Sequence, residues 1–264
     1  MTSLSSITSN RPLGGVHRRD HATLKIATYN VLFKTNPAQT KADLSRLMEH
    51  NGVLNLQEFT PNHQPVIPWA HSKGWGAFHP KGTEAAVMWD REKYAMEKAG
   101  SVKLNEGTDL AGRHYPAHRA TWVRLRDRAT GEVFTTVSVH TIAHNRGPKI
   151  TPKVDAIARH QFRVLGALAQ KASGHGPVLI GGDLNTQPGR QQTWPGRILK
   201  NAKLESNWQQ LGTKGVGPGT HGHSFIDQFL TLNPMRKDLK LMSHDIVTGL
   251  HSDHNALRAK YRLG

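Results

Sequence analysis

Short apolar runs that end in a polar side chain recur along the chain. LKIATYN (24–30), VLNLQE (53–58), TTVSVH (135–140) and PVLIGGDLN (177–185) have the length and boundaries of buried strands, and SFID (224–227) and HSDH (251–254) end in the same way. Together they present Asn30, Glu58, His140, Asp183, Asn185, Asp227, Asp253 and His254. Because a strand delivers the side chain at its end to the rim of a sheet, we expect these groups to line one hydrolytic, metal-assisted site.

Helical spacing predicts two helices, one over 42–50 and a longer one over 151–172 with Pro152 in its first turn. Further strands are expected at 85–89, 225–230, 239–247 and 256–263, and a hairpin joins 120–127 to 132–140. Hairpin and helical links together indicate mixed sheets. Two such sheets packed face to face, with helices outside, would bury all the apolar faces. The pattern therefore predicts an α+β fold, a two-layer mixed β-sandwich flanked by helices (α/β/β/α).

The length of 264 residues suits one large domain, expected over 23–264, after a basic, disordered arm at 1–22. The N-terminal segment lacks the continuous apolar core of a secretory signal, which favours a cytoplasmic location. No apolar stretch approaches the roughly 20 residues that span a bilayer. The absence of cysteine excludes disulfides and thiolate metal sites.

The net charge of the chain indicates a class of binding partner. Lys and Arg number 35 against 19 Asp and Glu, a net charge of +16. Such a surface attracts polyanions and binds phosphate backbones without regard to sequence. The alternative is a generally basic protein that its charge keeps soluble. The basic residues are spread along the chain, which suits a groove around a site better than a tail adsorbed on a membrane.

The order and wording of the six segments resemble the endonuclease/exonuclease/phosphatase superfamily, whose best-known nuclease is deoxyribonuclease I. The resemblance runs from Leu24 to Leu257, and its most specific parts are GGDLN after PVLI and SDH after SFID. It implies the same sandwich fold and metal-dependent hydrolysis of phosphoesters.

Glu58 is the first candidate for a magnesium ligand, because Mg²⁺ takes carboxylate oxygens and keeps several waters. Asn30 offers an uncharged oxygen beside it, and the resemblance places both at the metal; a surface carboxylate and a capping amide are the alternatives. Asp253 would add a carboxylate near the ion. Mn²⁺ is the expected substitute for Mg²⁺.

His254 and Asp227 are expected to form a base and its orienting carboxylate. By resemblance, His140 serves as general acid or phosphate donor, with Glu84 as a weaker candidate for orienting it. The resemblance also implies that Asp183 positions the attacking water and that Asn185 binds a phosphate oxygen, after a sharp turn that Gly181 and Gly182 would allow.

Arg119 resembles the arginine that grips a phosphate in deoxyribonuclease I, although a solvated strand arginine fits equally well. The histidines of HGH (221–223) and HSDH have spacings that could bind zinc, but no complete tetrahedral set is evident. The glycine-rich stretch 214–222 is expected to be a mobile loop beside the site. Trp194 and Trp208 could stack on bases or be partly buried.

Departures from the family pattern narrow the choice among the branches of the superfamily. Leu32 stands where abasic-site endonucleases usually carry an acidic residue, and His140 where they tend to carry Tyr, which points to the deoxyribonuclease I and sphingomyelinase branches. Gln228 stands where an aromatic residue often follows the Asp of SFID, so the family pattern does not define the local groove shape. The leading hypothesis is a monomeric magnesium-dependent phosphodiesterase that acts on nucleic acid, as a DNA endonuclease of low sequence specificity, without stable membrane association. A lipid or small-molecule phosphoesterase (a sphingomyelinase or inositol-phosphate phosphatase) is the alternative, followed by a non-enzymatic binding module.

Overall fold

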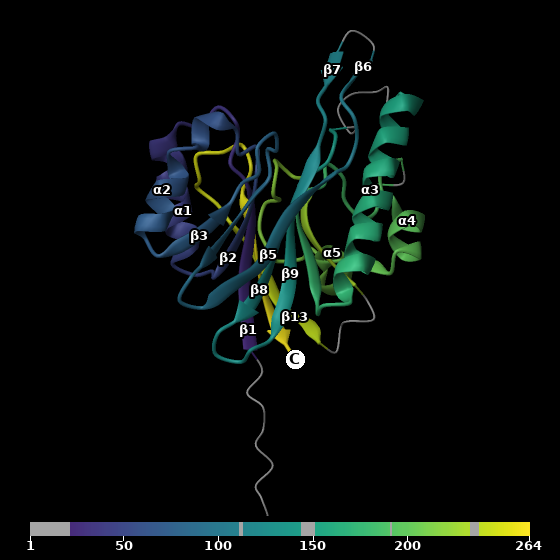
Figure 1. Ribbon diagram of the computed structural model, residues 1–264. Helices are drawn as coiled ribbons and strands as arrows, with labels where there is room; N and C mark the ends of the chain where they lie inside the picture. The colour runs from purple at the N-terminus through teal and green to yellow at the C-terminus, as the bar shows by residue number, and fades with distance from the viewer. Residues whose placement is uncertain (1–21, 111–112, 144–150, 191, 233–237) are drawn as a thin grey trace, which may run out of the picture.

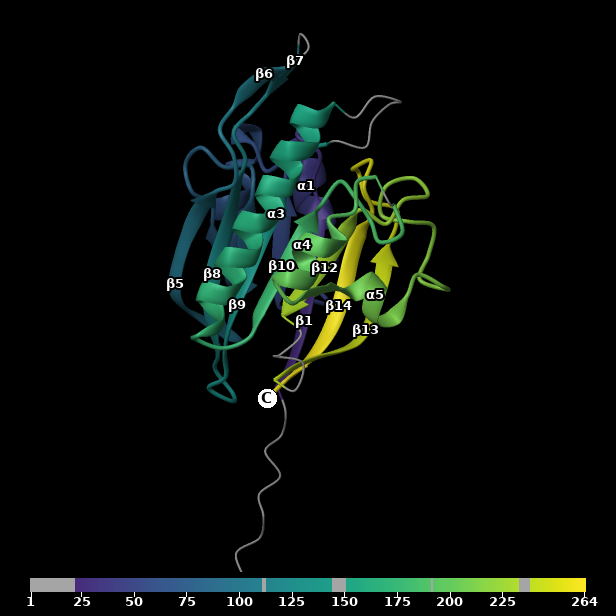
Figure 2. The ribbon, with the colours of Figure 1, turned by 90° about the vertical axis from the view of Figure 1, so that its right-hand side faces the viewer.

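The computed structural model describes residues 22–110, 113–143, 151–190, 192–232 and 238–264. Two six-stranded mixed sheets pack face to face, and helices cover their outer faces (Figures 1 and 2). The α/β/β/α sandwich predicted from the sequence is therefore confirmed. The predicted arm at 1–22 lies outside the described residues apart from Ala22, which begins the first strand.

The first sheet has the strand order β13-β14-β1-β2-β4-β3. Its strands are β1 (Ala22–Asn30), β2 (Val53–Gln57), β3 (Trp75–Phe78), β4 (Ala86–Asp90), β13 (Leu239–Val247) and β14 (Ala256–Leu263). β1 and β2 run parallel, and the other neighbouring pairs are antiparallel. The last strand in sequence thus lies inside the sheet, beside the first.

The second sheet has the order β11-β12-β10-β9-β8-β5. Its strands are β5 (Tyr94–Lys103), β8 (Arg119–Asp127), β9 (Val133–His140), β10 (Val178–Asp183), β11 (Leu204–Ser206) and β12 (Asp227–Leu232). β9 and β10 run parallel, and β8 and β9 form the predicted hairpin. Between β5 and β8, the strands β6 (Thr108–Leu110) and β7 (Arg113–Tyr115) pair separately and project from the body at the top of Figure 1.

Helices cover the outer faces of the sheets. α1 (Pro37–Met48) and α2 (Val66–Ser72), with the short helix η1 (Pro61–His63) before α2, pack on the first sheet, whereas α3 (Pro152–Ser173) and α4 (Gly196–Asn201) pack on the second. α5 (Asn207–Leu211) contacts β12 and β13. Among these described helices, none is long and apolar enough to cross a membrane.

The longer helix agrees with its prediction, but α1 begins at Pro37, well before residue 42. Asn36 caps it: its side chain accepts a hydrogen bond from the Gln39 N–H, and the Gln39 side chain accepts one from the Asn36 N–H. The first turn carries no apolar periodicity, so the prediction, which followed apolar spacing, missed it.

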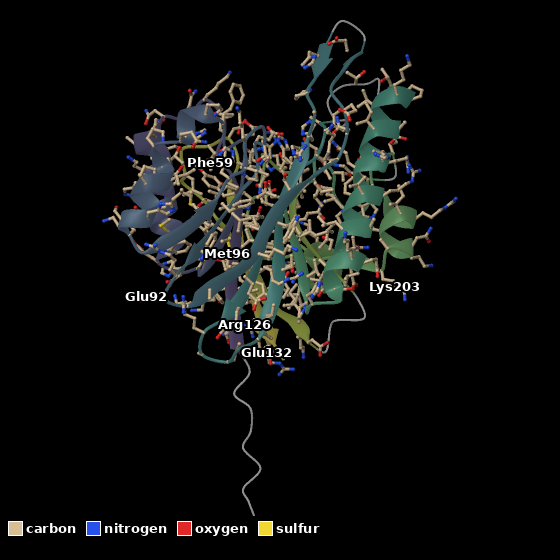
Figure 3. The ribbon with its side chains drawn as sticks, in the orientation of Figure 1. Phe59, Glu92, Met96, Arg126, Glu132 and Lys203 are labelled. Atoms are coloured by element: carbon tan, nitrogen blue, oxygen red, sulfur yellow. The ribbon has the colours of Figure 1, made fainter. Side chains whose placement is uncertain are left out.

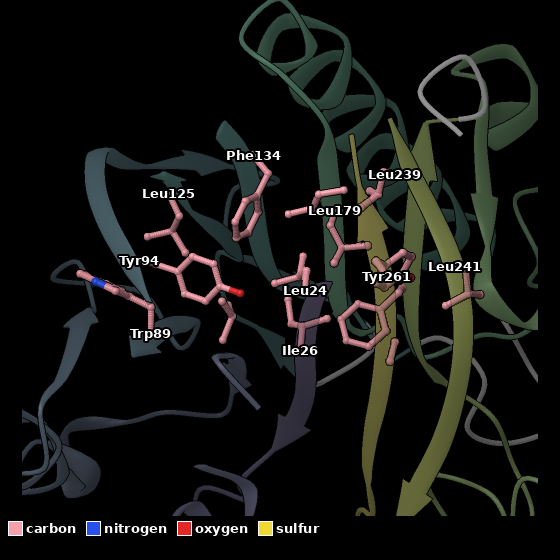
Figure 4. Packing of buried hydrophobic residues seen from close by; sticks show 14 of the residues in the cluster. Leu24, Ile26, Trp89, Tyr94, Leu125, Phe134, Leu179, Leu239, Leu241 and Tyr261 are labelled. Carbon is pink, nitrogen blue, oxygen red and sulfur yellow. The ribbon is translucent and has the colours of Figure 1, made fainter. Parts of the chain in front are cut away.

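Large apolar side chains from both sheets fill the space between them (Figure 4). Leu24, Ile26 and Tyr261 of the first sheet share one cluster with Phe134 and Leu179 of the second, and each is at most 1% exposed. Burying a side chain of this size stabilises the folded state by about 1.5–3 kcal/mol. This core fixes the two sheets, and the side chains at their rims, relative to each other.

Buried polar side chains link the sheets nearer the rim. Asn55 Nδ2 donates to the Val137 carbonyl at 3.1 Å, and Gln57 Nε2 donates to Ser138 Oγ at 3.0 Å. Gln57 directly precedes Glu58, and Ser138 lies two residues before His140. Because buried hydrogen bonds are costly to break, these links set the distance between the strand ends that carry both groups.

The polar strand ends gather at one end of the sandwich. Asn30 pairs with Gln57, and Asp183 pairs with His140 on one side and Asp227 on the other. β12 and β14 run antiparallel to β10 and β1, so Asp227 at the start of β12 and His254 just before β14 reach this rim. Figure 3 shows Phe59, the residue after Glu58, at this end, and Arg126 and Glu132, which flank the β8–β9 turn, at the other.

Candidate active site

The carboxylate of Glu58 is held after the end of β2 by one group at the end of β1 and one just after it. Oε1 accepts a hydrogen bond from Asn30 Nδ2 at 3.1 Å, and Oε2 accepts one from the Phe33 N–H at 3.0 Å. Glu58 and Leu32 have left-handed backbones, with φ of 54° and 58°. Non-glycine residues rarely adopt this conformation, and it persists where the surrounding structure requires it. Here it directs the Glu58 carboxylate at the rim.

Asp183 occupies the centre of the site. Its Oδ2 lies 3.3 Å from Asn30 Nδ2, 3.4 Å from His140 Nε2 and 3.7 Å from His254 Nε2. Its Oδ1 accepts the backbone N–H of Asn185 at 2.8 Å. One buried carboxylate oxygen therefore faces both imidazoles and the amide that also holds Glu58.

His254 and Asp227 form the predicted hydrogen-bonded pair. His254 Nδ1 lies 2.9 Å from Asp227 Oδ2, which leaves Nε2 facing Asp183. Burial favours the neutral ring, but the negative charge of Asp227 outweighs it and raises the pKa of His254 to about 9. Burial raises the pKa of Asp227, against the opposing effect of His254. The carboxylate of Asp227 therefore favours the protonated ring of His254.

His140 shares Glu84 with a second histidine. Glu84 Oε1 lies 3.2 Å from His140 Nδ1 and 2.9 Å from His118 Nδ1, so one carboxylate oxygen faces both rings. Burial lowers the pKa of His140, but the charges of Glu84 and Asp183 raise it to about 10. Burial raises the pKa of Glu84, yet the charge of His140 holds it well below its usual range.

His118 is a site residue that sequence reasoning missed. It sits in PAHRA just before β8, where no spacing pattern marks it. Its ring is buried and contacts the His140 ring edge to face at 5.7 Å. The signal available in the sequence was a second histidine beside Arg119, at a strand start on the same sheet as His140.

A cavity of about 500 Å³ opens over these groups. The predicted residues that line it are Glu58, His140, Asp183, Asn185, Asp253 and His254, and Lys34 and His114 add basic groups to its wall. Asn30 and Asp227 lie behind this lining and contact Glu58 and His254. The structure thus brings eight predicted residues together at one rim.

Three of the predicted residues differ in what their side chains contact. Asn185 donates Nδ2 to the Thr141 carbonyl at 2.9 Å, within the site. The Asp253 side chain is 51% exposed, and its Oδ2 lies 3.8 Å from His221 Nε2. Arg119 lies outside the cavity lining, where its guanidinium donates to Ser101 Oγ at 3.1 Å.

The reason predicted for the Gly181-Gly182 pair is wrong. Both glycines lie within β10 and have ordinary backbone angles, so they form no sharp turn. They are required because neighbours approach closely: a Cβ on Gly182 would lie 1.8 Å from the Val139 carbonyl oxygen, and one on Gly181 would lie 2.5 Å from the Phe229 ring. Their absence of side chains lets β10 carry Asp183 into a tightly packed rim.

The tryptophans belong to the packed interior. Trp208 is 5% exposed and donates its indole N–H to the Asp227 carbonyl at 3.0 Å, so it does not stack on a base. Trp194 packs partly buried against the cluster beneath α3 and α4. The glycine-rich stretch does lie beside the site, because the ring of its His221 is 4.5 Å from that of His254.

The donor set fits a hard divalent cation. Glu58 and Asp183 both point towards Asn30 and both line the cavity, and Mg²⁺ takes one or two such carboxylates together with water. The Asn30 oxygen accepts the Leu32 N–H at 3.0 Å, so the amide presents nitrogen and positions the two carboxylates. Glu58 and Asp183 would hold the ion, with Asn30 orienting both.

Histidines backed by carboxylates, beside a carboxylate pair on the rim of a β-sandwich, define a hydrolytic phosphoester site. The model of the Endonuclease/Exonuclease/phosphatase family matches residues 27–231, and the chain belongs to this family. It is a phosphoesterase of that superfamily, whose members generally depend on a divalent metal. No curated protein sequence matches it at a significant level.

Solved structures share the fold. The human nocturnin catalytic domain with bound sulfate has a TM-score of 0.71 and 15% identity, covering 94% of this chain and 98% of that one. D. rerio TDP2 complexed with a single-strand DNA product has a TM-score of 0.65 and 15% identity, covering 91% and 99%. A Bacteroides thetaiotaomicron mannosyl-6-phosphatase has a TM-score of 0.65 and 14% identity, covering 90% and 99%. At these identities the likeness establishes the fold alone.

Proposed function

We propose that the protein is a divalent-metal-dependent phosphodiesterase that hydrolyses nucleic acid, as a DNA endonuclease with low sequence specificity. The observation that carries this proposal is the convergence of Glu58, Asp183, His140 and His254 on one cavity in a chain with a net charge of +16. The catalytic groups support phosphodiester hydrolysis, and the charge supports a polyanionic substrate.

Mg²⁺ is the proposed ion, with Mn²⁺ as a substitute. When bound, it supplies positive charge that stabilises the developing charge on phosphorus and its oxygens. Glu58 is the principal proposed ligand. Asp253 is the further proposed ligand, and its exposed carboxylate lies 3.8 Å from His221 Nε2.

His254 is proposed to take a proton from the attacking water at Nε2, because Nδ1 is bonded to Asp227. Asp183, 3.7 Å from Nε2, would orient that water. The pKa of His254 near 9 means that the base form of the ring increases as the pH rises towards that value. Asp227 holds the ring in the tautomer that exposes Nε2.

His140 is proposed to protonate the leaving oxygen. Its pKa of about 10 keeps the ring protonated at neutral pH, and Glu84 keeps it at the cavity wall. Asn185 uses one amide hydrogen on Thr141, which leaves the other for a phosphate oxygen. These roles require a protonated acid and a deprotonated base. His140 would be the acid, and His254 would be the base once it has lost its proton.

Basic groups around the cavity support a polymeric substrate. Lys34 and His114 lie in its wall, and Arg119, which lies outside the lining, is proposed to contact a phosphate further along the backbone. Contacts of this kind raise affinity for phosphate backbones of any sequence. DNA is therefore the proposed partner of a monomer that has no stable membrane association.

Nicking of supercoiled plasmid tests the proposal directly. The wild type should nick the plasmid with Mg²⁺ or Mn²⁺, lose this activity with a chelator, and lose it in Glu58→Ala. Intact plasmid under all metal conditions would overturn the nuclease assignment. The same panel should include sphingomyelin, inositol phosphates and mannose 6-phosphate, to distinguish a nuclease from the alternative. A lipid or small-molecule phosphoesterase would release phosphate or phosphocholine and leave DNA untouched.

A further inference from the structure

His221, Asp253 and His254 form a cluster of metal-ligating side chains at the edge of the cavity. One nitrogen or oxygen atom from each lies within 4.8 Å of the other two. His221 Nε2 is 3.8 Å from Asp253 Oδ2, and the rings of His221 and His254 are 4.5 Å apart. The roles proposed for phosphodiester hydrolysis leave His221 without a task.

The backbone, rather than side-chain flexibility, places His221 here. An isolated β-bridge pairs His221 with His254, and Asn255 donates its backbone N–H to the Thr220 carbonyl at 2.7 Å. Gly219 has φ of +114°, and a Cβ there would lie 2.6 Å from the Gly222 carbonyl oxygen, so the loop needs glycine at that position. These backbone contacts therefore place His221 against His254.

The ligand chemistry selects the class of metal. His254 gives Nδ1 to Asp227, and a carboxylate behind an imidazole is the usual support of a metal-binding histidine. Two imidazoles, one carboxylate and a water form a set that suits Zn²⁺, whereas Mg²⁺ prefers oxygen ligands. The side chains of His221 and Asp253 are 35% and 51% exposed, so they have room to close on an ion and an open path for its entry.

We propose that His221, Asp253 and His254 bind a zinc ion, and that zinc bound there inhibits hydrolysis by occupying Nε2 of His254. The binding site stands on the cluster alone. The inhibition rests on the proposed function, because it assumes that this nitrogen must take a proton from water.

Calorimetric titration with Zn²⁺ tests the binding. The full-length wild type, His221→Asn and His223→Asn are compared in excess Mg²⁺, which occupies carboxylate sites. His223 lies two residues from His221 in the same loop and outside the cluster, so it is the matched control. The tightest zinc site should weaken at least about tenfold in His221→Asn and stay unchanged in His223→Asn. Equal weakening in both variants, or none in His221→Asn, would overturn the zinc site.

Measuring plasmid nicking against zinc concentration at constant Mg²⁺ tests the proposed inhibition. The zinc concentration that halves the rate should rise about tenfold in His221→Asn, which keeps its activity without zinc, and stay constant in His223→Asn. If zinc binds tightly but does not inhibit, the proposed zinc site stands and the proposed inhibition is wrong. If no substrate is cleaved at all, the nuclease proposal fails, and the calorimetric comparison still decides the zinc site.

Discussion

Glu84→Gln removes the negative charge that two histidines share, while it keeps the shape of the side chain. In the wild type, Glu84 Oε1 lies 3.2 Å from His140 Nδ1 and 2.9 Å from His118 Nδ1. Burial lowers the pKa of His140, and Glu84 contributes most to raising it to about 10. In the variant, burial is opposed mainly by Asp183, so the pKa of His140 should fall towards its ordinary value of 6.5.

The free energy of unfolding should fall by an amount that depends on pH. A pKa of 6.5 in the unfolded chain and about 10 in the folded one corresponds to about 5 kcal/mol, and breaking a buried ion pair costs about 3–5 kcal/mol. Because the folded pKa is the higher one, this stabilisation is complete below pH 6.5 and disappears as the pH rises to about 10. Glu84→Gln should therefore cost about 3–5 kcal/mol at pH 6 but only about 1–2 kcal/mol at pH 9.

Urea unfolding at pH 6 and pH 9, with NMR titration of the His140 ring, measures both effects. Glu97→Gln is the control, because Glu97 pairs with the half-exposed Arg126 and should cost less than about 1 kcal/mol at either pH. The same loss at both pH values, or a His140 ring that stays protonated above pH 9 in Glu84→Gln, would refute the electrostatic account.

Three further changes test other parts of the structure. Glu58→Ala should abolish metal-dependent nicking while the circular dichroism spectrum is retained, and near-normal rates would remove Glu58 from the metal site. Arg119→Ala should weaken DNA binding and reduce the slope of log affinity against log salt by about one; an unchanged slope would show that it makes no phosphate contact. Gly182→Ala places a Cβ 1.8 Å from the Val139 carbonyl oxygen and should cost about 3 kcal/mol or more in urea unfolding, whereas Gly174→Ala, with no atom closer than 3.9 Å, should cost less than about 1 kcal/mol.

The fold and the centre of the site could be predicted because their signals are local. A buried strand such as β10 is a continuous apolar run, and the side chain that follows it must lie at the sheet rim whatever the tertiary packing. Asp183, His140 and Glu58 were found in this way. Order along the chain then identified Asp227 and His254, because the same segments recur in the superfamily.

What could not be predicted depends on contacts between distant residues. β5 lies at a sheet edge, has only one buried residue, Tyr94, and changes register between Met96 and Lys98, so its alternation is broken. The contact of Glu84 with His118 and the reason for Gly182 both arise from close approaches between residues far apart in the sequence. Arg119 lies at the sequence position expected for a phosphate-binding arginine, but its guanidinium donates a hydrogen bond to Ser101 Oγ.

The position of β14 has a consequence for biosynthesis. Ribosomes make β1 early, but its neighbour on one side is β14, whose last residue is Leu263. Until that segment emerges from the exit tunnel, β1 has an open edge, β13 has no partner, and His254 is not in place beside Asp227. The first sheet and the pair of Asp227 and His254 are therefore completed only after β14 has been made.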